Sequence, residues 1–238
     1  MVEDLAEAFG VSAHTIRRDI NTLCEEAKLR RLHGGAEYME GQANLPYHAR
    51  AVLHFDGKTA IARAVAREVP DGATVFISIG TTPAIVAGAL AGRRGLTVVT
   101  NNLNAAFALS EEPTNRIILP GGELRLPDRD ILGPEAMALF ATYRADVAIY
   151  GVGGIDHDGS LLDFHASEVQ MREQMRRNAR RSVLVADRTK FGRRAAAVGG
   201  RLEEADMLVL DQAPEGPWRG LLDSFPGRLV LAGELVEG

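Results

Sequence analysis

From Gly57 onward, short continuous apolar runs alternate with segments of helical periodicity, and this alternation constrains the fold more than any other feature of the chain. Strands that are buried on both faces read as unbroken apolar runs, because neither face contacts water. The helical segments between them supply the crossover connections that a parallel sheet requires. The sequence therefore predicts an α/β domain with a mostly parallel, Rossmann-like sheet. Its predicted strands are Thr74–Ile79, Leu96–Thr100, Arg116–Leu119, Val147–Tyr150, Ser182–Ala186, Met207–Leu210 and Leu229–Ala232.

The composition is that of an ordinary globular protein. The chain has 238 residues, of which 46% are apolar and 25% are charged, and this length suffices for one mid-sized and one small domain. The net charge is -5, so any contact with nucleic acid has to come from a local basic patch. Cys24 is the only cysteine, which excludes an internal disulfide and a multi-cysteine metal site and suits a reducing cytoplasm. We expect neither a metal nor a cofactor.

One uncharged stretch, residues 73–92, is long enough to be considered as a membrane span. Its middle, residues 78–83, reads as a turn between a strand and a helix, so we expect no spanning helix. Residues 1–4 are acidic and lack the basic region of a signal peptide. The sequence thus predicts a cytoplasmic protein without a membrane partner.

The first 36 residues have the order of a winged helix-turn-helix. Residues 2–9 predict a short helix, Gly10 supplies its left-handed stop, and Ser12 caps a second helix over residues 13–26. Residues 29–36 then predict a basic hairpin with a glycine tip, which corresponds to the wing. The predicted domains are a DNA-binding domain over residues 1–40, a linker over residues 41–56 and a sensor domain over residues 57–238.

The exposed face of the second helix carries side chains that suit DNA. Arginine can bond guanine bidentately, while threonine and asparagine reach phosphates or base edges. An ordinary solvated basic helix is the alternative, and the combination of glycine stop, serine cap and basic wing favours DNA. The predicted DNA-binding residues are Ser12, His14, Thr15, Arg17, Arg18 and Asn21 on the helix side and Arg30, Arg31 and His33 on the wing.

The clearest candidate for a ligand site is Gly80-Thr81-Thr82-Pro83, which follows a predicted buried strand and opens a helix. Thr82 can cap this helix, and Pro83 fits the first turn, where its missing N–H costs nothing. A helix N-terminus with free backbone N–H groups and two hydroxyls is an anion site. A purely structural helix cap is the alternative interpretation.

Polar loops follow several other predicted strands, and ligands of open parallel sheets bind beyond the carboxyl ends of the strands. We therefore expect these loops to converge on one crevice, although each loop alone is more often a simple turn. Asn101 could bond a hydroxyl or a phosphate, Lys190 could add positive charge, and Asp163 could accept from hydroxyls or instead cap the helix predicted over residues 165–177. The predicted effector-binding residues are Gly80, Thr81, Thr82, Asn101, Gly121, Gly122, Gly153, Asp163 and Lys190.

A charged loop follows Gly122. It is either a mobile lid or a solvated surface, and for two of its aspartates, Asp128 and Asp130, the sequence favours the solvated surface. The loop's charged residues are Arg125, Asp128, Arg129 and Asp130.

These motifs resemble those of the DeoR family of bacterial repressors. The blocks at residues 15–19 (Thr-Ile-Arg-Arg-Asp) and 33–36 (His-Gly-Gly-Ala) resemble the DNA-binding head of the family. The blocks at residues 76–82, 99–102, 121–124, 153–156 and 187–192 resemble its sensor domain. Residues 46–50, 79–83, 100–104 and 155–162 are most similar to those family members that regulate glycerol-3-phosphate metabolism.

The resemblance implies a sensor with the ribose-5-phosphate isomerase and CoA-transferase type of fold. It further implies a homo-oligomeric repressor that binds operator DNA and releases it when a phosphorylated small molecule binds, with glycerol 3-phosphate or a sugar phosphate as the expected effector. Ser78 stands where the family usually has aspartate, which changes the polar contact below the phosphate loop.

The family head normally opens with a further helix that packs under the two predicted here. This chain starts at what corresponds to the second helix, so we expect a truncated DNA-binding domain. Its apolar stripe is then expected to lack a partner, and consists of Leu5, Phe9, Ile16, Ile20 and Leu23.

Two alternative functions stay open, a sugar-phosphate isomerase and a sensor that lacks DNA binding. Isomerisation needs a carboxylate base over the substrate carbon. Isomerases of this type carry an acidic block after the strand that corresponds to Val147–Tyr150, whereas this chain has Gly-Val-Gly-Gly at residues 151–154, although Asp156, Asp158 and Asp163 follow nearby. Glycine cannot abstract a proton, so we expect a regulator and not an enzyme.

Overall fold

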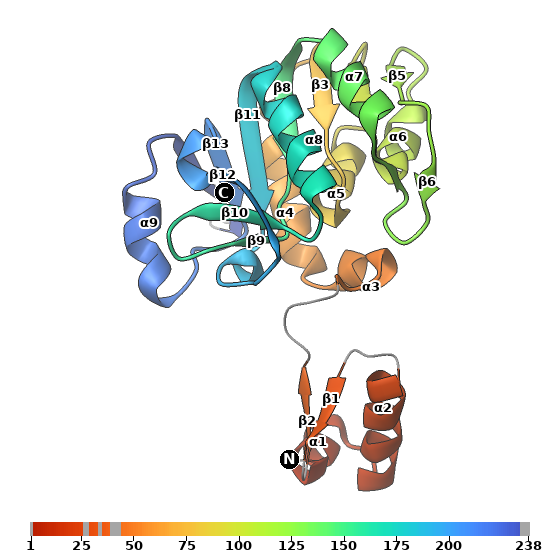
Figure 1. The fold of residues 1–238 in the computed structure, drawn as a ribbon, viewed down its shortest axis with the longest axis vertical. Helices are drawn as coiled ribbons and strands as arrows, with labels where there is room; N and C mark the ends of the chain where they lie inside the picture. The colour runs from red at the N-terminus through yellow and green to blue at the C-terminus, as the bar shows by residue number, and fades with distance from the viewer. Residues whose placement is uncertain (1, 26–28, 33–34, 39–43, 234–238) are drawn as a thin grey trace. The chain divides into compact units, whose positions relative to one another are not determined.

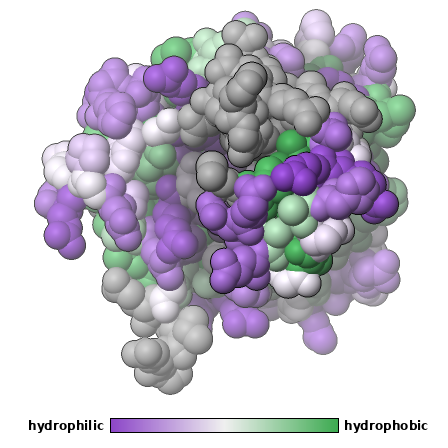
Figure 2. All heavy atoms as spheres, turned by 90° about the horizontal axis from the view of Figure 1, so that it is seen from below, coloured by the Kyte–Doolittle hydropathy of each residue, from purple (hydrophilic) through white to green (hydrophobic). Residues whose placement is uncertain are grey.

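The protein is described by a computed structural model, which shows the backbone of residues 2–25, 29–32, 35–38 and 44–233 and the side chains of residues 2–22 and 44–233 (Figure 1). The chain folds as two compact units, Met1–Leu45 and Pro46–Gly238. Among the described helices, none has both the length and the apolar character needed to cross a bilayer. The face drawn in Figure 2 is mostly hydrophilic, with smaller hydrophobic areas between the polar ones.

The first unit has the predicted order of elements. Helix α1 spans Val2–Phe9, helix α2 spans Ala13–Glu25, and strands β1 (Leu29–Leu32) and β2 (Gly35–Tyr38) pair antiparallel. Gly10 ends α1 with φ of 64°, and the Thr15 N–H donates to Ser12 Oγ over 3.1 Å, so the predicted stop and cap are both confirmed.

The small core of the first unit covers only part of the predicted apolar stripe. Ile16 and Ile20 are buried against Val2. Leu5 and Phe9 keep 42% and 70% of their surface exposed. Leu23 lies outside the residues whose side chains are described.

The second unit is built on a seven-stranded parallel sheet with the order β14-β13-β11-β8-β3-β4-β5. All seven predicted strands are confirmed. Three of them, β8, β11 and β14, begin before the predicted positions. Their early residues include the exposed charged side chains of Asp146, Arg180 and Arg228, which do not read as part of an apolar run. The strands are β3 (Thr74–Ile77), β4 (Thr97–Thr100), β5 (Arg116–Ile118), β8 (Ala145–Tyr150), β11 (Ala179–Ala186), β13 (Met207–Leu210) and β14 (Arg228–Leu231).

Helices cover both faces of this sheet, as a parallel sheet requires. Three helices pack on one face over strand residues such as Val75 and Val98, and two pack on the other face, where Phe140 meets Phe76 edge to face at 5.1 Å (Figure 1). The first set is α4 (Phe55–Ala66), α5 (Thr81–Ala89) and α6 (Leu103–Ser110), and the second is α7 (Pro134–Thr142) and α8 (Ala166–Arg177).

Smaller elements surround the carboxyl ends of the strands. A hairpin is formed by β6 (Leu124–Arg125) and β7 (Asp130–Ile131), and a three-stranded antiparallel sheet is formed by β9 (Gly154–Ile155), β10 (Ser160–Asp163) and β12 (Ala197–Arg201). Helix α9 (Arg219–Asp223) packs beside the small sheet, with the single-turn helices η1 (Arg188–Lys190), η2 (Leu202–Glu204) and η3 (Gly216–Trp218).

The predicted irregular linker is partly wrong. Residues 47–52 form helix α3 (Tyr47–Val52), and α4 begins at Phe55, inside the predicted linker. Helix α3 is stabilised from outside its own sequence, since the Lys58 ammonium donates to its terminal carbonyls at Arg50 and Leu53 over 2.5 and 2.7 Å. Such tertiary contacts leave no local pattern, which is why the segment reads as irregular.

The strand order reverses next to β3. The chain forms β3, β4 and β5 outward in one direction and then returns to place β8 on the other side of β3. The loops that follow β3 and β8 therefore turn away from each other at the carboxyl ends of these two strands. This is the position where open parallel sheets bind ligands.

Candidate functional site

The first part of the site is the cradle, defined here as Gly80–Thr82 at the start of α5. Gly80 has φ of 112°, a conformation that favours glycine. The first bond of α5 runs from the Ala84 N–H to the Gly80 carbonyl over 3.3 Å. The N–H groups of Thr81 and Thr82 lie before this first bond, so no carbonyl of the helix can accept from them. They carry the partial positive charge of the helix N-terminus. Pro83, the next residue, contributes no N–H.

Asn102 fixes the cradle in position. Its side-chain amide nitrogen donates to the Ser78 and Gly80 carbonyls, each over 3.1 Å. Its side-chain oxygen accepts from the Asn104 and Ala105 N–H groups and so caps α6. The sequence predicts its neighbour Asn101 as the contact instead. The only local signal for Asn102 is its position as the cap of α6. Its contacts with the cradle join residues more than twenty positions apart in the sequence, so no local pattern reveals them.

Asn101 contacts β7 and, among the described residues, forms no hydrogen bond with the cradle. Its side chain is fully buried, and its amide nitrogen donates to the Ile131 carbonyl over 3.0 Å. Its side-chain oxygen has no hydrogen-bond partner within the described residues. A direct contact of Asn101 with an effector stays a prediction.

The loop after β8 joins the cradle to a buried carboxylate. The Gly151 N–H donates to Ser78 Oγ over 3.4 Å, and the Gly153 N–H donates to Asp163 Oδ1 over 2.8 Å. A Cβ at Gly153 would lie 3.0 Å from the Leu162 carbonyl oxygen, so a side chain would displace this loop. Ser78 thus supplies a neutral hydrogen-bonded link between the carboxyl ends of β3 and β8.

Asp163 is paired as well as buried. Arg172 Nε of α8 lies 3.2 Å from Asp163 Oδ2. Burial raises the pKa of Asp163 to about 6, and the positive charge of Arg172 opposes this shift. The alternative prediction that Asp163 caps the following helix is wrong, because it lies in β10 and the residue that precedes α8 is His165.

Lys190 brings positive charge to the same region. It is partly buried in the loop after β11. Burial lowers the pKa of Lys190 to about 7, and the nearby cations Arg193, Lys58 and Arg50 lower it further, while Asp187 opposes them. Lys190 also lies close enough to Asp163 to act on its pKa. An anion bound here would relieve the mutual repulsion of these cations.

Arg193 connects this loop to the one after β8. Its Nη1 donates to the Gly153 carbonyl over 3.2 Å, and its guanidinium lies 4.9 Å from the Phe164 ring centre. Gly153, Asp163 and Lys190 therefore belong to one neighbourhood, which Ser78 and Gly151 join to the cradle. Six of the nine predicted effector-binding residues meet in this way.

Of the other two predicted glycines, only Gly122 lies close to the β6–β7 hairpin. A Cβ at Gly122 would lie 3.3 Å from Cγ2 of Ile131 in β7, and Gly121 is exposed. A role for either glycine in effector binding stays a prediction.

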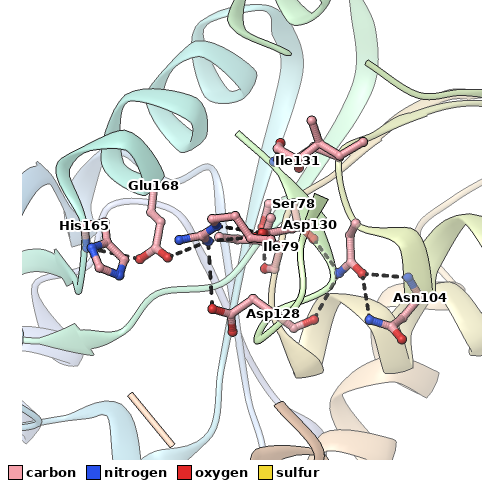
Figure 3. A network of polar contacts seen from close by, with 12 residues as sticks. Ser78, Ile79, Asn104, Asp128, Asp130, Ile131, His165 and Glu168 are labelled. Atoms are coloured by element: carbon pink, nitrogen blue, oxygen red, sulfur yellow. Dashed lines mark hydrogen bonds and ion pairs between the residues drawn. The ribbon is translucent and has the colours of Figure 1, made fainter. Parts of the chain in front are cut away.

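The charged loop is part of the hairpin and is not a solvated surface. Arg125 donates twice to Asp130, over 2.8 and 2.7 Å, and once to Glu168 of α8 over 3.0 Å (Figure 3). Asp130 is fully buried and Asp128 exposes 19% of its side chain, so the predicted solvated positions are wrong. Burial of charged groups requires such pairing.

Comparison with known protein families covers both units. Residues 53–212 match the DeoR C terminal sensor domain, and residues 1–42 match the DeoR-like helix-turn-helix domain. The chain belongs to the DeoR family. It is 44% identical to the glycerol-3-phosphate regulon repressor of Escherichia coli over 212 residues, which cover 89% of this chain and 84% of that protein. It is 37% identical to the HTH-type transcriptional repressor CsqR of Escherichia coli, over 98% of this chain and 89% of that protein.

The solved structures to which the chain is similar include ribose 5 phosphate isomerase A from Neisseria gonorrhoeae. That structure aligns with 57% of this chain and 53% of its own, at 15% identity and a TM-score of 0.42.

The helix-turn-helix of this DeoR-family chain exposes four of the six predicted DNA-binding residues whose side chains are described. Ser12, His14, Arg17 and Arg18 are exposed, and Thr15 and Asn21 are partly buried. Glu3 Oε1 of α1 lies 2.9 Å from Arg17 Nη2 and orients it. Two further predicted residues, Arg30 and Arg31, lie in β1 with side chains outside the described set, and His33 lies outside the described residues.

We predict that Asn102→Asp weakens effector binding by about tenfold and also lowers the unfolding midpoint in urea, because Asn102 is buried and the new carboxylate faces two carbonyl oxygens. The aspartate keeps the acceptor that caps α6 but loses the two donors that hold the cradle, and an unmet hydrogen bond costs about 1–3 kcal/mol. Asn104→Asp adds the same charge in the same helical turn and serves as the control. Titration calorimetry with glycerol 3-phosphate measures the affinities, and equal losses in both variants would contradict a positioning role for Asn102.

The lowered pKa of Lys190 predicts a pH dependence of effector affinity. A bound anion favours the protonated ammonium, so above pH 7 binding has to take up a proton, and affinity falls as the pH rises from 7 to 9. In this range the effector phosphate and Asp163 are already ionised. Lys190→Arg stays charged throughout and should remove the decline. A decline of the same size in both proteins, measured by calorimetry, would exclude Lys190 as its source.

For the DNA-binding unit, we predict that Arg17→Ala relaxes operator specificity. Loss of one bidentate base contact costs about 1–3 kcal/mol against the preferred base pair and leaves the others nearly unaffected. Binding to a set of single-base operator variants measures this effect, with Arg63→Ala on the exposed face of α4 as a control. Uniform weakening across all variants would instead assign Arg17 to a phosphate contact.

Proposed function

We propose that this chain is a DNA-binding transcriptional repressor that dissociates from operator DNA when a phosphorylated small molecule binds to it. The small molecule is either glycerol 3-phosphate or a sugar phosphate. The observation that carries this proposal is the cradle, where the backbone N–H groups of Thr81 and Thr82 have no acceptor among the described residues and stand at the switch point of the sheet. A phosphate is the group that such a helix N-terminus binds best.

The relatives support this effector class, since one that shares 44% identity over most of the chain is named for the glycerol-3-phosphate regulon. The effector's phosphate docks on Gly80–Thr82, and the ammonium of Lys190 supplies positive charge. Asp163, which keeps one oxygen directed to Arg172, accepts from effector hydroxyls. A phosphorylated polyol presents both kinds of group.

The surroundings of β8 favour binding without turnover. Isomerisation requires a carboxylate that is free to take a proton from carbon. Asp156 accepts from the His157 N–H over 2.7 Å and Asp158 from the Ser160 N–H over 2.9 Å, so both belong to the turn before β10. The Gly153 N–H and Arg172 both stabilise the ionised form of Asp163, so this carboxylate can accept from hydroxyls but its gain of a proton from carbon is opposed. We therefore propose a sensor and not an isomerase, and measurable isomerisation of ribose 5-phosphate at enzyme-like rates would contradict this.

The regulatory step is a population shift. A homo-oligomer in the cytoplasm presents several DNA-binding units to repeated or palindromic half-sites. The effector binds the arrangement that cannot engage DNA more tightly than the competent one, and it moves the population by the ratio of these affinities. The match of residues 1–42 to a helix-turn-helix family favours this over a sensor without DNA binding.

We predict that Thr81→Asp makes the repressor uninducible. The added carboxylate repels the phosphate at the cradle and lowers effector affinity by more than about tenfold, while operator affinity without effector stays unchanged. Thr81→Val removes the hydroxyl but keeps the backbone N–H, so it should retain most of the affinity. Fluorescence anisotropy of labelled operator, with and without glycerol 3-phosphate, measures both quantities, and normal release of DNA by Thr81→Asp would exclude the cradle as the phosphate site.

A further inference from the structure

The β6–β7 hairpin contacts the segment that holds the cradle. The Leu103 N–H donates to the Arg129 carbonyl over 3.1 Å, and the Ile131 N–H donates to the Asn101 carbonyl over 3.0 Å. These two bonds flank Asn102, whose side chain fixes the Ser78 and Gly80 carbonyls. A displacement of the cradle is therefore transmitted directly to the hairpin backbone.

The same hairpin holds helix α3 with its tip. The Tyr47 N–H donates to the Pro127 carbonyl over 3.4 Å, and the Arg50 guanidinium forms an ion pair with the Asp128 carboxylate. The side chains of this pair are only 12% and 19% exposed, so it is shielded from bulk solvent and is stronger than a surface pair. Arg129 of the hairpin also stacks near the Tyr47 ring, at 6.0 Å from its centre.

The hairpin is stiff enough to move as one body. Arg125 closes it internally through two bonds to Asp130, reaches Asp128 at 3.9 Å, and ties it to α8 through Glu168, as Figure 3 shows. A rigid element that touches two sites can couple them, whereas a flexible loop would absorb the change.

The charge of a bound effector also acts on the cations that belong to helix α3 or hold it. Arg50 and Lys58 are both close enough to Lys190 to influence its ionisation, and the Lys58 ammonium holds the carbonyl end of α3. An anion that binds beside Lys190 attracts Arg50 away from Asp128. Both routes, through the hairpin and through the cations, converge on the same ion pair.

We propose that the Arg50–Asp128 ion pair is the coupling contact that transmits effector occupancy to α3. Helix α3 is the first helix of the second unit, and the chain that precedes it leads to the DNA-binding unit. A change in how tightly α3 is bound to the hairpin therefore acts on the segment that connects α3 to the helix-turn-helix. This inference rests on the proposed function, since it specifies how release is achieved.

The test compares Arg50→Gln, Asp128→Asn and the double variant in the full chain. Effector binding is followed with glycerol 3-phosphate through the fluorescence of Trp218, the only tryptophan, whose ring contacts Phe191 beside Lys190. DNA binding is followed by anisotropy on a duplex that the wild-type protein selects from a random pool. Arg63→Gln, an exposed arginine of α4, is the matched control for loss of charge.

The coupling ratio is the affinity for DNA without effector divided by that with saturating effector, and allosteric ratios are typically about 5–150. We expect Asp128→Asn to bind the effector within about threefold of the wild type and Arg50→Gln to bind it more weakly, because that variant removes a cation near Lys190. At saturating effector the coupling ratio of each should fall to within about twofold of unity. The double variant should have the same coupling ratio as either single variant, because both act through one pair. Arg63→Gln should keep the wild-type ratio.

Two outcomes overturn the inference. Variants that bind the effector and still release DNA with the wild-type ratio show that the pair is not the coupling contact. A loss of effector affinity in Arg50→Gln that accounts for the whole loss of release shows that Arg50 is a ligand contact only. A wild-type protein whose Trp218 signal and DNA binding both ignore glycerol 3-phosphate contradicts the proposed effector instead, so the two failures are distinguishable.

Discussion

The first two backbone N–H groups of α5 cannot be satisfied by the helix that contains them, and the remainder of the account depends on this constraint. The sheet places these groups where its strand order reverses, so that the ends of β3 and β8 open toward the same region. Ser78 and Asn102 hold the loop from both sides without occupying the two donors. A fixed and partly positive helix end follows, and phosphate is the ligand that satisfies it at least cost.

The cations around Lys190 add further positive charge to that of the helix N-terminus at the cradle. Their mutual repulsion and their burial keep the pKa of Lys190 near 7, which means that the protein holds them together against an electrostatic cost. An anionic ligand removes that cost, and the same cations include Arg50, which belongs to the helix nearest the DNA-binding unit in sequence. Recognition of the effector and the release of DNA are in this way linked by charge, and the hairpin adds a mechanical link.

Much of this structure could be predicted from the sequence because its causes are local. Strands buried on both faces read as apolar runs, and Gly10, Ser12 and the Gly80–Pro83 turn act within a few residues of their own positions. Helix α3, the pairing of Asp163 with Arg172 and the burial of Asp130 depend on partners brought together only by the folded sheet. Polar residues in loops therefore read as solvated, and only the fold shows which of them are buried and paired.

The most direct measurement of the central claim is the amide proton chemical shift of Thr81 and Thr82 in isotope-labelled full-length protein, titrated with glycerol 3-phosphate and, separately, with glycerol. The account predicts large downfield shifts of these two amides with the phosphorylated compound and almost none with glycerol, because only the phosphate accepts hydrogen bonds at the cradle. Saturable binding of glycerol 3-phosphate that leaves both amides unshifted would contradict it and place the anion elsewhere in the protein.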